Sequence, residues 1–349
     1  MLRIAQVLER GLAGSPPWHR GVSRPWLWTF GRSVARRLEW PRHVRVVAVG
    51  GATLGGSGKT PLAIACAMEL SAVARTILVG HGYRAAVRRT RFVLPSDAVG
   101  LVGDEAIVAA RDLEASGLGA RVVVGPTRSA AVAWAAGEAD VLVLDGVCQT
   151  APTRASLALL AVDASEPWGS AAALPPCGDL RAPVSTLLDA CDGVVPLGDS
   201  ARLPLSFAQP GRTMPIWPAK VESRGAWLHT GRPGATRPEE LLSWETLRRL
   251  RVGLVTAMAR PDRVVRGLAL RGVRPCAVVC AQDHGPVGAS AVRACFKRAQ
   301  AERVEVWLST PKCALHVDGA RLGAPVAVLE YGLGLPPTLV ALLRAIALP

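Results

Sequence analysis

The stretch VRVVAVGGATLGGSGKTP, residues Val44–Pro61, decides the fold of this chain. Its first residues, 44–50, are mostly β-branched and apolar, which predicts a buried strand. A glycine-rich turn follows, and Gly58-Lys59-Thr60 opens a predicted helix. Glycines let the backbone close around a phosphate with its N–H groups pointing inward, and the helix N-terminus adds partial positive charge. The stretch therefore predicts a phosphate-binding loop (P-loop) that holds a nucleotide.

The residue types within this loop suggest individual roles. Lys59 is expected to reach the β- and γ-phosphates, and Thr60 to offer its hydroxyl to Mg²⁺. The general pattern has Gly where this chain has Thr53, although two later glycines keep the turn flexible. A chance glycine-rich turn is the alternative, and the strand before it and the helix after it argue against that. The predicted nucleotide-binding residues are Thr53, Gly55, Gly56, Ser57, Gly58, Lys59 and Thr60.

Strands and helices alternate on the C-terminal side of the loop. The predicted strands are 76–80, 121–124, 141–144 and 157–162, and the predicted helices are about 60–73, 103–116 and 128–137. Residues 164–245 are rich in Pro and Gly and are interpreted as sheet edge plus linker. A second alternation then begins, with strands at 252–256, 276–280 and 304–308 and helices at 261–271 and 289–300. This order predicts parallel sheets with right-handed crossovers.

The fold class that follows is α/β: a P-loop NTPase-type parallel-sheet domain with a second, smaller α/β domain. We place a basic amphipathic segment at 1–43, the P-loop domain with its linker at 44–245, and the smaller domain at 246–349. The length of 349 residues suits two domains, and 50% hydrophobic residues exclude a disordered tail protein.

The net charge of +14 is unevenly distributed. Residues 1–45 hold nine Arg against Glu9 and Glu39, together with four of the ten Trp. Residues 25–39 have helical spacing of apolar side chains with Arg interleaved, which predicts an amphipathic helix at an anionic membrane surface. The alternative is a helix packed on the protein's own core. The sequence shows no spanning segment and no signal peptide, so we expect an intracellular protein.

Eight cysteines are scattered along the chain without zinc-ligand spacing, and buried free thiols are expected.

Three acidic or titratable positions outside the loop are candidates for chemistry. Asp145 closes the apolar run VLVLD and fits a Mg²⁺-associated aspartate; a turn aspartate in an Asp-Gly pair is the alternative. Asp104 stands in VGDEA at a predicted helix start, where an N-cap with a first-turn acid is as good an explanation as catalysis. His284 follows Asp283 in AQDHG after a strand, either as a surface residue or as a proton-transfer partner.

Taken in order, these motifs resemble the tetraacyldisaccharide 4′-kinases, the lipid A kinases of Gram-negative bacteria. The segments that carry the resemblance are TLGGSGKTP (53–61), HGYR (81–84), VGDEA (102–106), VVVGPTRSAA (122–131), VLVLDGVCQT (141–150), AVDASEPWGSAAALPPCGDLRAP (161–183), AMARPDR (257–263), AQDHG (281–285) and STPKCA (309–314). Thr53 and the basic amphipathic N-terminus are also family features.

The resemblance implies transfer of the γ-phosphate of ATP to the 4′-hydroxyl of tetraacyldisaccharide 1-phosphate. The product would be lipid IVA, formed at the cytoplasmic face of the inner membrane by a peripheral enzyme with its active site in the cleft between two domains. It implies that Asp104 is the catalytic base, that His284 assists it, and that Thr60 and Asp145 hold Mg²⁺. We expect a monomer that does not bind nucleic acid, the latter because its basic residues cluster in a Trp-bearing segment rather than a stacking groove.

The chain also departs from the family pattern. Where the family has Asp-Asp-Gly-aromatic/Leu-Gln-His, residues 145–150 read DGVCQT. Aligning on Gln149 makes Gly146 and Thr150 the replacements for the second Asp and the His, whereas aligning on Asp-Gly needs an insertion. The family's Thr-Glu-Lys-Asp reads TPKC at 310–313, with both acids lost. These losses leave open a catalytically impaired homologue that binds nucleotide or lipid without turnover.

Overall fold

The computed structural model divides the chain into two compact units, Met1–Val221 with Leu333–Pro349, and Glu222–Gly332. It describes residues 25, 35–82, 85–152, 154–169, 171–198, 213–229, 240–258, 261–281, 287–317 and 321–348. The division differs from the boundary at 245–246 inferred from the sequence. Two strands before that boundary pair with the second unit's sheet, and the last helix belongs to the first unit.

The first unit is built around a seven-stranded sheet with the order β4-β5-β3-β6-β2-β8-β9. All its neighbouring pairs are parallel except β4 with β5. The strands of this sheet are β2 (Arg45–Gly51), β3 (Thr76–Val79), β4 (Arg91–Phe92), β5 (Arg121–Val124), β6 (Val141–Asp145), β8 (Leu157–Asp163) and β9 (Gly193–Leu197). Among the described residues, the helices of this unit are α4 (Lys59–Ser71), α5 (Val99–Val102), α6 (Asp104–Ser116), α7 (Arg128–Ala135), α8 (Val184–Asp189) and α13 (Pro337–Ala347).

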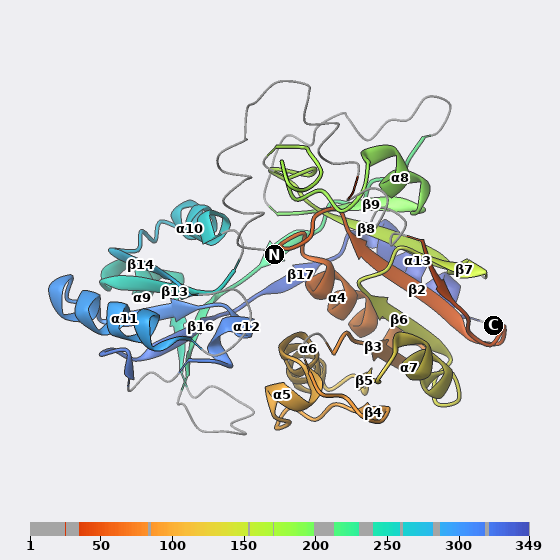
Figure 1. Cartoon of the computed structure of the whole chain (residues 1–349), viewed down its shortest axis with the longest axis horizontal. Coiled ribbons are helices and arrows are strands. Elements are labelled where there is room, and N and C mark those ends of the chain that lie inside the picture. The colour runs from red at the N-terminus through yellow and green to blue at the C-terminus, as the bar shows by residue number, and fades with distance from the viewer. Residues whose placement is uncertain are drawn as a thin grey trace. The chain divides into compact units, whose positions relative to one another are not determined.

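The strand that leads into the phosphate loop lies in the middle of this sheet. β2 pairs with β6 on one side and β8 on the other, and every residue of β2 after Arg45 is buried. Its neighbours are equally apolar, which is typical of strands covered by helices on both faces. Figure 1 shows α4 beginning at the carboxyl end of β2, so the loop lies at the sheet edge where ligands of parallel α/β folds bind.

The second unit has a six-stranded sheet with the order β12-β11-β16-β15-β13-β14. Its strands are β11 (Gly225–His229), β12 (Leu241–Ser243), β13 (Val252–Thr256), β14 (Ala277–Cys280), β15 (Val306–Ser309) and β16 (Val326–Leu329). The helices are α9 (Trp244–Arg249), α10 (Pro261–Leu270), α11 (Ala289–Ala301) and α12 (Pro311–Ala314). Two further strands, β10 (Lys220–Glu222) and β17 (Gly332–Gly334), pair with each other where the chain passes between the units.

Separate apolar clusters cover the two faces of the second sheet. Leu247 of α9 and Leu268 of α10 join one cluster, with Leu254 of β13. Cys295 and Ala299 of α11 join the other. In Figure 1, α10 and α11 accordingly lie on opposite sides of the sheet.

The predicted amphipathic helix over 25–39 is wrong at its C-terminal end. Residues Ala35–Leu38 form strand β1, which pairs in parallel with β7 (Gln149–Pro152). Leu38, the last residue of β1, and Trp40 are buried in the core of the first unit. Pro25 is helical, and residues 26–34 lie outside the described residues.

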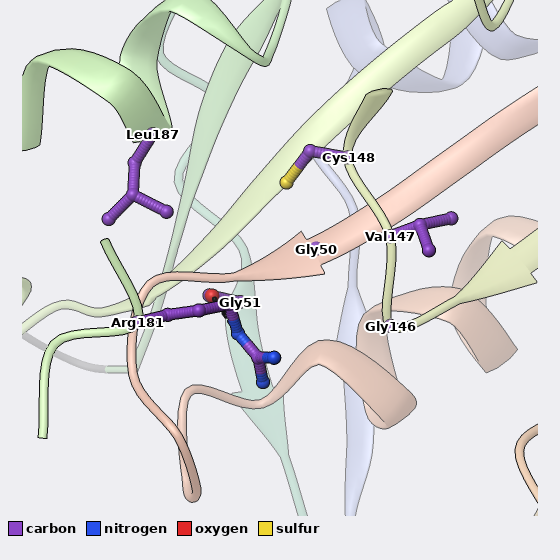
Figure 2. A pocket seen from close by; sticks show the side chains of 7 residues that line it. All are labelled: Gly50, Gly51, Gly146, Val147, Cys148, Arg181 and Leu187. Carbon is purple, nitrogen blue, oxygen red and sulfur yellow. Dashed lines mark hydrogen bonds between the residues drawn. The ribbon is translucent and has the colours of Figure 1, made fainter. Parts of the chain in front are cut away.

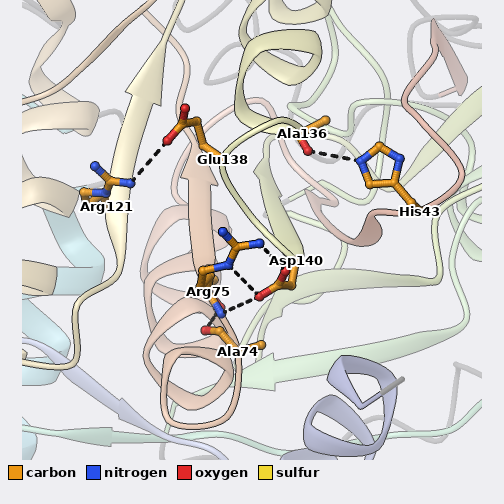
Figure 3. Close-up of polar contacts among 8 residues, drawn as sticks. His43, Ala74, Arg75, Arg121, Ala136, Glu138 and Asp140 are labelled. Atoms are coloured by element: carbon orange, nitrogen blue, oxygen red, sulfur yellow. Dashed lines mark hydrogen bonds and ion pairs between the residues drawn. The ribbon is translucent and has the colours of Figure 1, made fainter.

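The amino ends of the strands in the first unit are held by polar contacts (Figure 3). Arg75, just before β3, pairs with Asp140, just before β6, with Nη2 and Oδ1 2.7 Å apart. Arg121 at the start of β5 lies 3.9 Å from Glu138, and His43 contacts the carbonyl at the end of α7. Exposed pairs of this kind contribute about 0–1 kcal/mol each. These pairs lie at the amino ends of the strands, on the edge of the sheet opposite the phosphate loop. The residues that could bind a ligand lie at the other edge, at the carboxyl ends of the strands.

The eight cysteines are free thiols, of which six are buried, Cys276 is half-buried and Cys280 is exposed. Among the described residues, the helices are too short or too polar for any of them to cross a membrane.

We predict that replacing Asp112 with Asn stabilises the fold at alkaline pH. Asp112 is half-buried on α6, and burial raises its pKa from 3.8 to about 7, against the opposing effect of Arg111. The folded state therefore holds this proton more tightly, and stability falls as pH rises between those values. Asp112→Asn should raise the Tm at pH 8 by roughly 2–6 °C and leave it nearly unchanged at pH 4.

Thermal unfolding across this pH range checks the prediction. Glu114→Gln, at an exposed position on the same helix, is the matched control. A gain for Asp112→Asn that does not depend on pH would contradict the role assigned to burial.

Candidate active site

The phosphate loop closes by contacts that its sequence makes possible. Gly58 precedes α4 with φ of 79°, in the left-handed region that favours glycine. A Cβ on Gly58 would lie 2.3 Å from Leu197 Cδ1. Within the turn, the Thr53 hydroxyl donates to the Gly55 carbonyl at 2.7 Å, which links the position where the general pattern has glycine to the turn itself.

A second segment, 179–181, supports the loop from outside. The Leu54 N–H donates to the Asp179 carbonyl at 2.8 Å, and the Arg181 N–H donates to the Ala52 carbonyl at 2.9 Å. Arg181 Nε also donates to the Gly51 carbonyl at 3.3 Å. Sequence reasoning counted this segment only as part of a resemblance, because nothing local shows that it pairs with a loop more than 120 positions earlier.

The two predicted metal ligands are brought together. Thr60 Oγ1 donates to Asp145 Oδ2 at 2.7 Å, across 85 positions of sequence. Asp145 is 2% exposed, and its Oδ1 is a buried atom without a hydrogen-bond partner among the residues that the structure describes. Burial raises the pKa of Asp145, and the nearby Lys59 ammonium opposes this shift.

This arrangement fits a divalent cation. An ionised carboxylate oxygen left unsatisfied in a protein interior is costly, and such an atom calls for an explanation. Mg²⁺ prefers oxygen ligands and is commonly held by one or two protein oxygens together with substrate phosphates. Asp145 Oδ1 and the Thr60 hydroxyl are donors of that kind, beside a loop built for phosphate.

Two further acids lie at the start of α6. Asp104 is the first helical residue, is 6% exposed, and accepts the Glu105 N–H at 2.8 Å through Oδ1. The N-cap residue is Gly103, so Asp104 does not cap the helix, although both acids suit its first turn. Glu105 Oε1 lies 3.7 Å from Lys59 Nζ. The VGDEA motif thus approaches the phosphate loop through this ion pair.

Arg128 is a site residue that residue-by-residue reasoning missed. It begins α7 after the N-cap Thr127, and its guanidinium donates to the Asp145 carbonyl. A cation in the first turn of a helix is disfavoured by the helix dipole. An arginine at the predicted start of a helix was therefore the feature of the sequence that could have indicated an acidic neighbour, which the structure shows to be Asp145.

A small pocket lies beside residues Gly146, Val147 and Cys148, where the chain leaves β6 (Figure 2). It is lined by Gly50, Gly51, Gly146, Val147, Cys148, Arg181 and Leu187. Gly146 has φ of 90°, and a Cβ there would lie 3.5 Å from Arg128 Nη2 and 3.7 Å from Lys59 Cε. The positive φ suits glycine and strains aspartate, which favours aligning Gly146 with the glycine of the family's Asp-Gly pair.

His284 and Asp283 lie outside the described residues, so the structure does not place the predicted proton-transfer partner. The strand before them, β14, pairs with β13, and the Ala281 N–H donates to the Thr256 carbonyl at 2.8 Å. In the same unit, the altered TPKC segment forms α12, where Thr310 caps the helix. There Cys313 Sγ accepts the Ala257 N–H at 3.2 Å.

A buried strand that runs through a glycine loop into a lysine-bearing helix defines a P-loop nucleotide-binding protein. The profile of one such family, the tetraacyldisaccharide-1-P 4′-kinases, matches residues 22–347. The chain belongs to this family.

Individual relatives agree with this assignment. A tetraacyldisaccharide 4′-kinase of a Methylobacterium species is 32% identical over 90% of this chain and 89% of its own length. One from Anaeromyxobacter dehalogenans is 32% identical over 80% of this chain and 74% of its own. The fold resembles the crystal structure of LpxK from Aquifex aeolicus in complex with ATP, with a TM-score of 0.62, 18% identity, and coverage of 99% and 98%. The family and these relatives therefore indicate the activity of a tetraacyldisaccharide 4′-kinase in lipid A biosynthesis.

We predict that Gly58→Ala weakens ATP binding at least tenfold. Alanine at this φ costs about 1–2 kcal/mol, and its Cβ would displace Leu197, so the loop amides would turn away from the phosphates. Equilibrium binding of a fluorescent ATP analogue measures the loss. Gly100→Ala is the control, because a Cβ at Gly100 meets nothing within 4 Å. Undiminished affinity in Gly58→Ala would show that the loop does not need this conformation.

Proposed function

We propose that phosphoryl transfer to the 4′-hydroxyl takes place at the carboxyl edge of the seven-stranded sheet, with the residues of that edge in distinct roles. The observation that carries this proposal is the hydrogen bond between Thr60 and Asp145 beside the phosphate loop, where the buried Asp145 Oδ1 has no partner among the described residues. A phosphate loop, a hydroxyl and a carboxylate next to one another are the parts that a phosphoryl-transfer site requires.

The loop binds and orients the ATP phosphates. Its backbone amides and the Lys59 ammonium offset their negative charge, and Lys59 exchanges its contact with Glu105 for one with the nucleotide. Arg128 holds the Asp145 carbonyl and so keeps the end of β6 in place. Mg²⁺, held by Thr60 and Asp145, would supply further neutralisation of the charge on the transferring phosphoryl group.

Asp104 accepts the proton of the sugar hydroxyl as the hydroxyl oxygen bonds to the γ-phosphorus; the bond from the γ-phosphorus to the bridging oxygen of the β-phosphate breaks, and ADP leaves. Its carboxylate is held at the start of α6 by the Glu105 N–H, close to the loop but outside it. This position suits a base that receives a proton from the acceptor rather than a ligand of the nucleotide. We assign His284 the task of assisting Asp104, on the resemblance of AQDHG to the family motif.

The acceptor is a lipid, so the enzyme must reach a membrane surface. The five Arg and three Trp of residues 1–34 support peripheral attachment at the cytoplasmic face of the inner membrane. We also propose that the enzyme acts as a monomer. Trp40 and the residues of β1 belong to the fold, which leaves the segment before residue 35 for this contact.

Asp104→Asn should lower kcat by about 10²–10⁴-fold while ATP binding stays unchanged, because the amide cannot accept the proton. The measurement is transfer of labelled phosphate from ATP to tetraacyldisaccharide 1-phosphate by purified enzyme. Asp112→Asn, the same substitution on the same helix, is the control and should retain activity. Wild-type enzyme without turnover would support the catalytically impaired alternative.

Asp145→Asn should raise the Mg²⁺ concentration that ATP binding requires by about tenfold or more, because the amide offers the cation a weaker ligand. Since burial raises the pKa of Asp145, the Mg²⁺ requirement of the wild type should also increase as pH falls.

Calorimetric titration of ATP at several Mg²⁺ concentrations tests both statements. Asp140→Asn, at the other end of β6, is the matched control. Identical Mg²⁺ dependence in the wild type and Asp145→Asn would remove Asp145 from the metal site.

A further inference from the structure

The outer face of α11 in the second unit carries basic side chains and no acid. The helix sequence is ASAVRACFKRAQA, and Arg293, Lys297 and Arg298 are all exposed. Arg293 and Lys297 are four residues apart, so they project from the same face of the helix. Within the part of the chain that the structure describes, none of the three forms an ion pair with a carboxylate.

An exposed aromatic ring borders these charges. Phe296 is 44% exposed, and its ring lies over Gly323, where φ is 78° and a Cβ would come within 3.1 Å of the ring. The opposite side of α11 buries Cys295 and Ala299 in the sheet. The helix therefore uses its apolar side for the core and presents cations with a partly exposed ring outward.

The helices on the other face of the same sheet, α9 and α10, contain acidic as well as basic residues. On α9, Arg249 pairs with Glu245 at 2.6 Å, and α10 contains Asp262 in its first turn. The acid nearest to α11 in sequence, its C-cap residue Glu302, lies 3.8 Å from Arg251, the residue before β13. Acids therefore accompany the basic residues of α9 and α10, whereas α11 itself has none among its residues Ala289–Ala301.

We propose that the outer face of α11 is a second membrane-contact surface, which binds the anionic headgroups of the bilayer that holds the lipid acceptor. This inference rests on the proposed function, because a lipid acceptor requires the enzyme to work at such a bilayer. Each basic side chain near an anionic surface contributes about 1 kcal/mol. A phenylalanine at the headgroup level adds apolar burial.

The chemistry favours a bilayer over a nucleic acid. Proteins that hold single strands use rows of aromatic side chains on which successive bases stack. The α11 face has one aromatic ring, and that ring is partly seated on Gly323. Unpaired cations beside a single apolar side chain match a layer of anionic headgroups over a hydrocarbon interior.

Flotation of the full-length enzyme with vesicles tests the proposal. The test variant is Arg293→Glu/Lys297→Glu, and the control is Arg249→Glu/Arg274→Glu, two exposed positions with the same change of charge outside α11. Binding of the test variant to phosphatidylglycerol-containing vesicles should fall about tenfold or more relative to the control. Binding of the wild type should also weaken as salt rises. Vesicles of phosphatidylcholine alone should show no difference between the variants.

Two further measurements separate the possible outcomes. Thermal unfolding shows whether the test variant is folded, and Arg293→Gln/Lys297→Gln replaces it if it is not. Kinase turnover with acceptor in neutral detergent should be equal in both variants, whereas turnover on anionic vesicles should fall only in the test variant. Equal vesicle binding by the two variants would overturn the proposal, as would selective loss of duplex DNA binding. If the wild type lacks turnover, the proposed function fails and vesicle binding still decides the role of α11.

Discussion

The rest of the first unit depends on one constraint, the position of β2 between β6 and β8. Parallel pairing places Val49 opposite Asp145, so β2 and β6 end side by side. The loop that leaves β2 and the helix that follows it then bring Thr60 within hydrogen-bond distance of a residue 85 positions away. The helices that cover the sheet, and the segment 179–181 that braces the loop, all serve to hold this edge.

The carboxyl edge of the seven-stranded sheet lowers the stability of the fold, because it buries the carboxylate of Asp145. Asp145 has one oxygen satisfied by Thr60 and one without a described partner, in an interior that disfavours its ionised form. Buried carboxylates reduce stability unless charges or hydrogen bonds compensate them. Lys59 and the guanidinium of Arg128 supply part of that compensation, and a cation with a phosphate would supply the rest. Such unsatisfied groups are typical of sites built to bind ligands rather than of structural cores.

The departures from the family pattern look less severe in three dimensions than in the sequence. Gly146 occupies a left-handed turn that glycine adopts without strain, and the neighbouring aspartate still reaches Thr60. In the second unit, Cys313 Sγ accepts the Ala257 N–H, and this contact joins α12 to the residue that follows β13. These contacts show how Gly146 and Cys313 are accommodated in this chain.

The sequence by itself determined the P-loop, the α/β class and most of the core strands, because these depend on local periodicity and on glycines whose conformations few other residues adopt. The strand predicted at 121–124 matches β5, and the helix predicted at 103–116 matches α6 within one residue. Only the tertiary structure decided that residues 35–38 pair with β7, that Arg128 holds Asp145, and that segment 179–181 supports the loop. Each of these contacts joins residues far apart in the chain, and their formation depends on which strands become neighbours in the sheet. The spacing of residues along the chain does not determine the order of the strands in the sheet. The partners of Asp145 therefore become evident only in the tertiary structure.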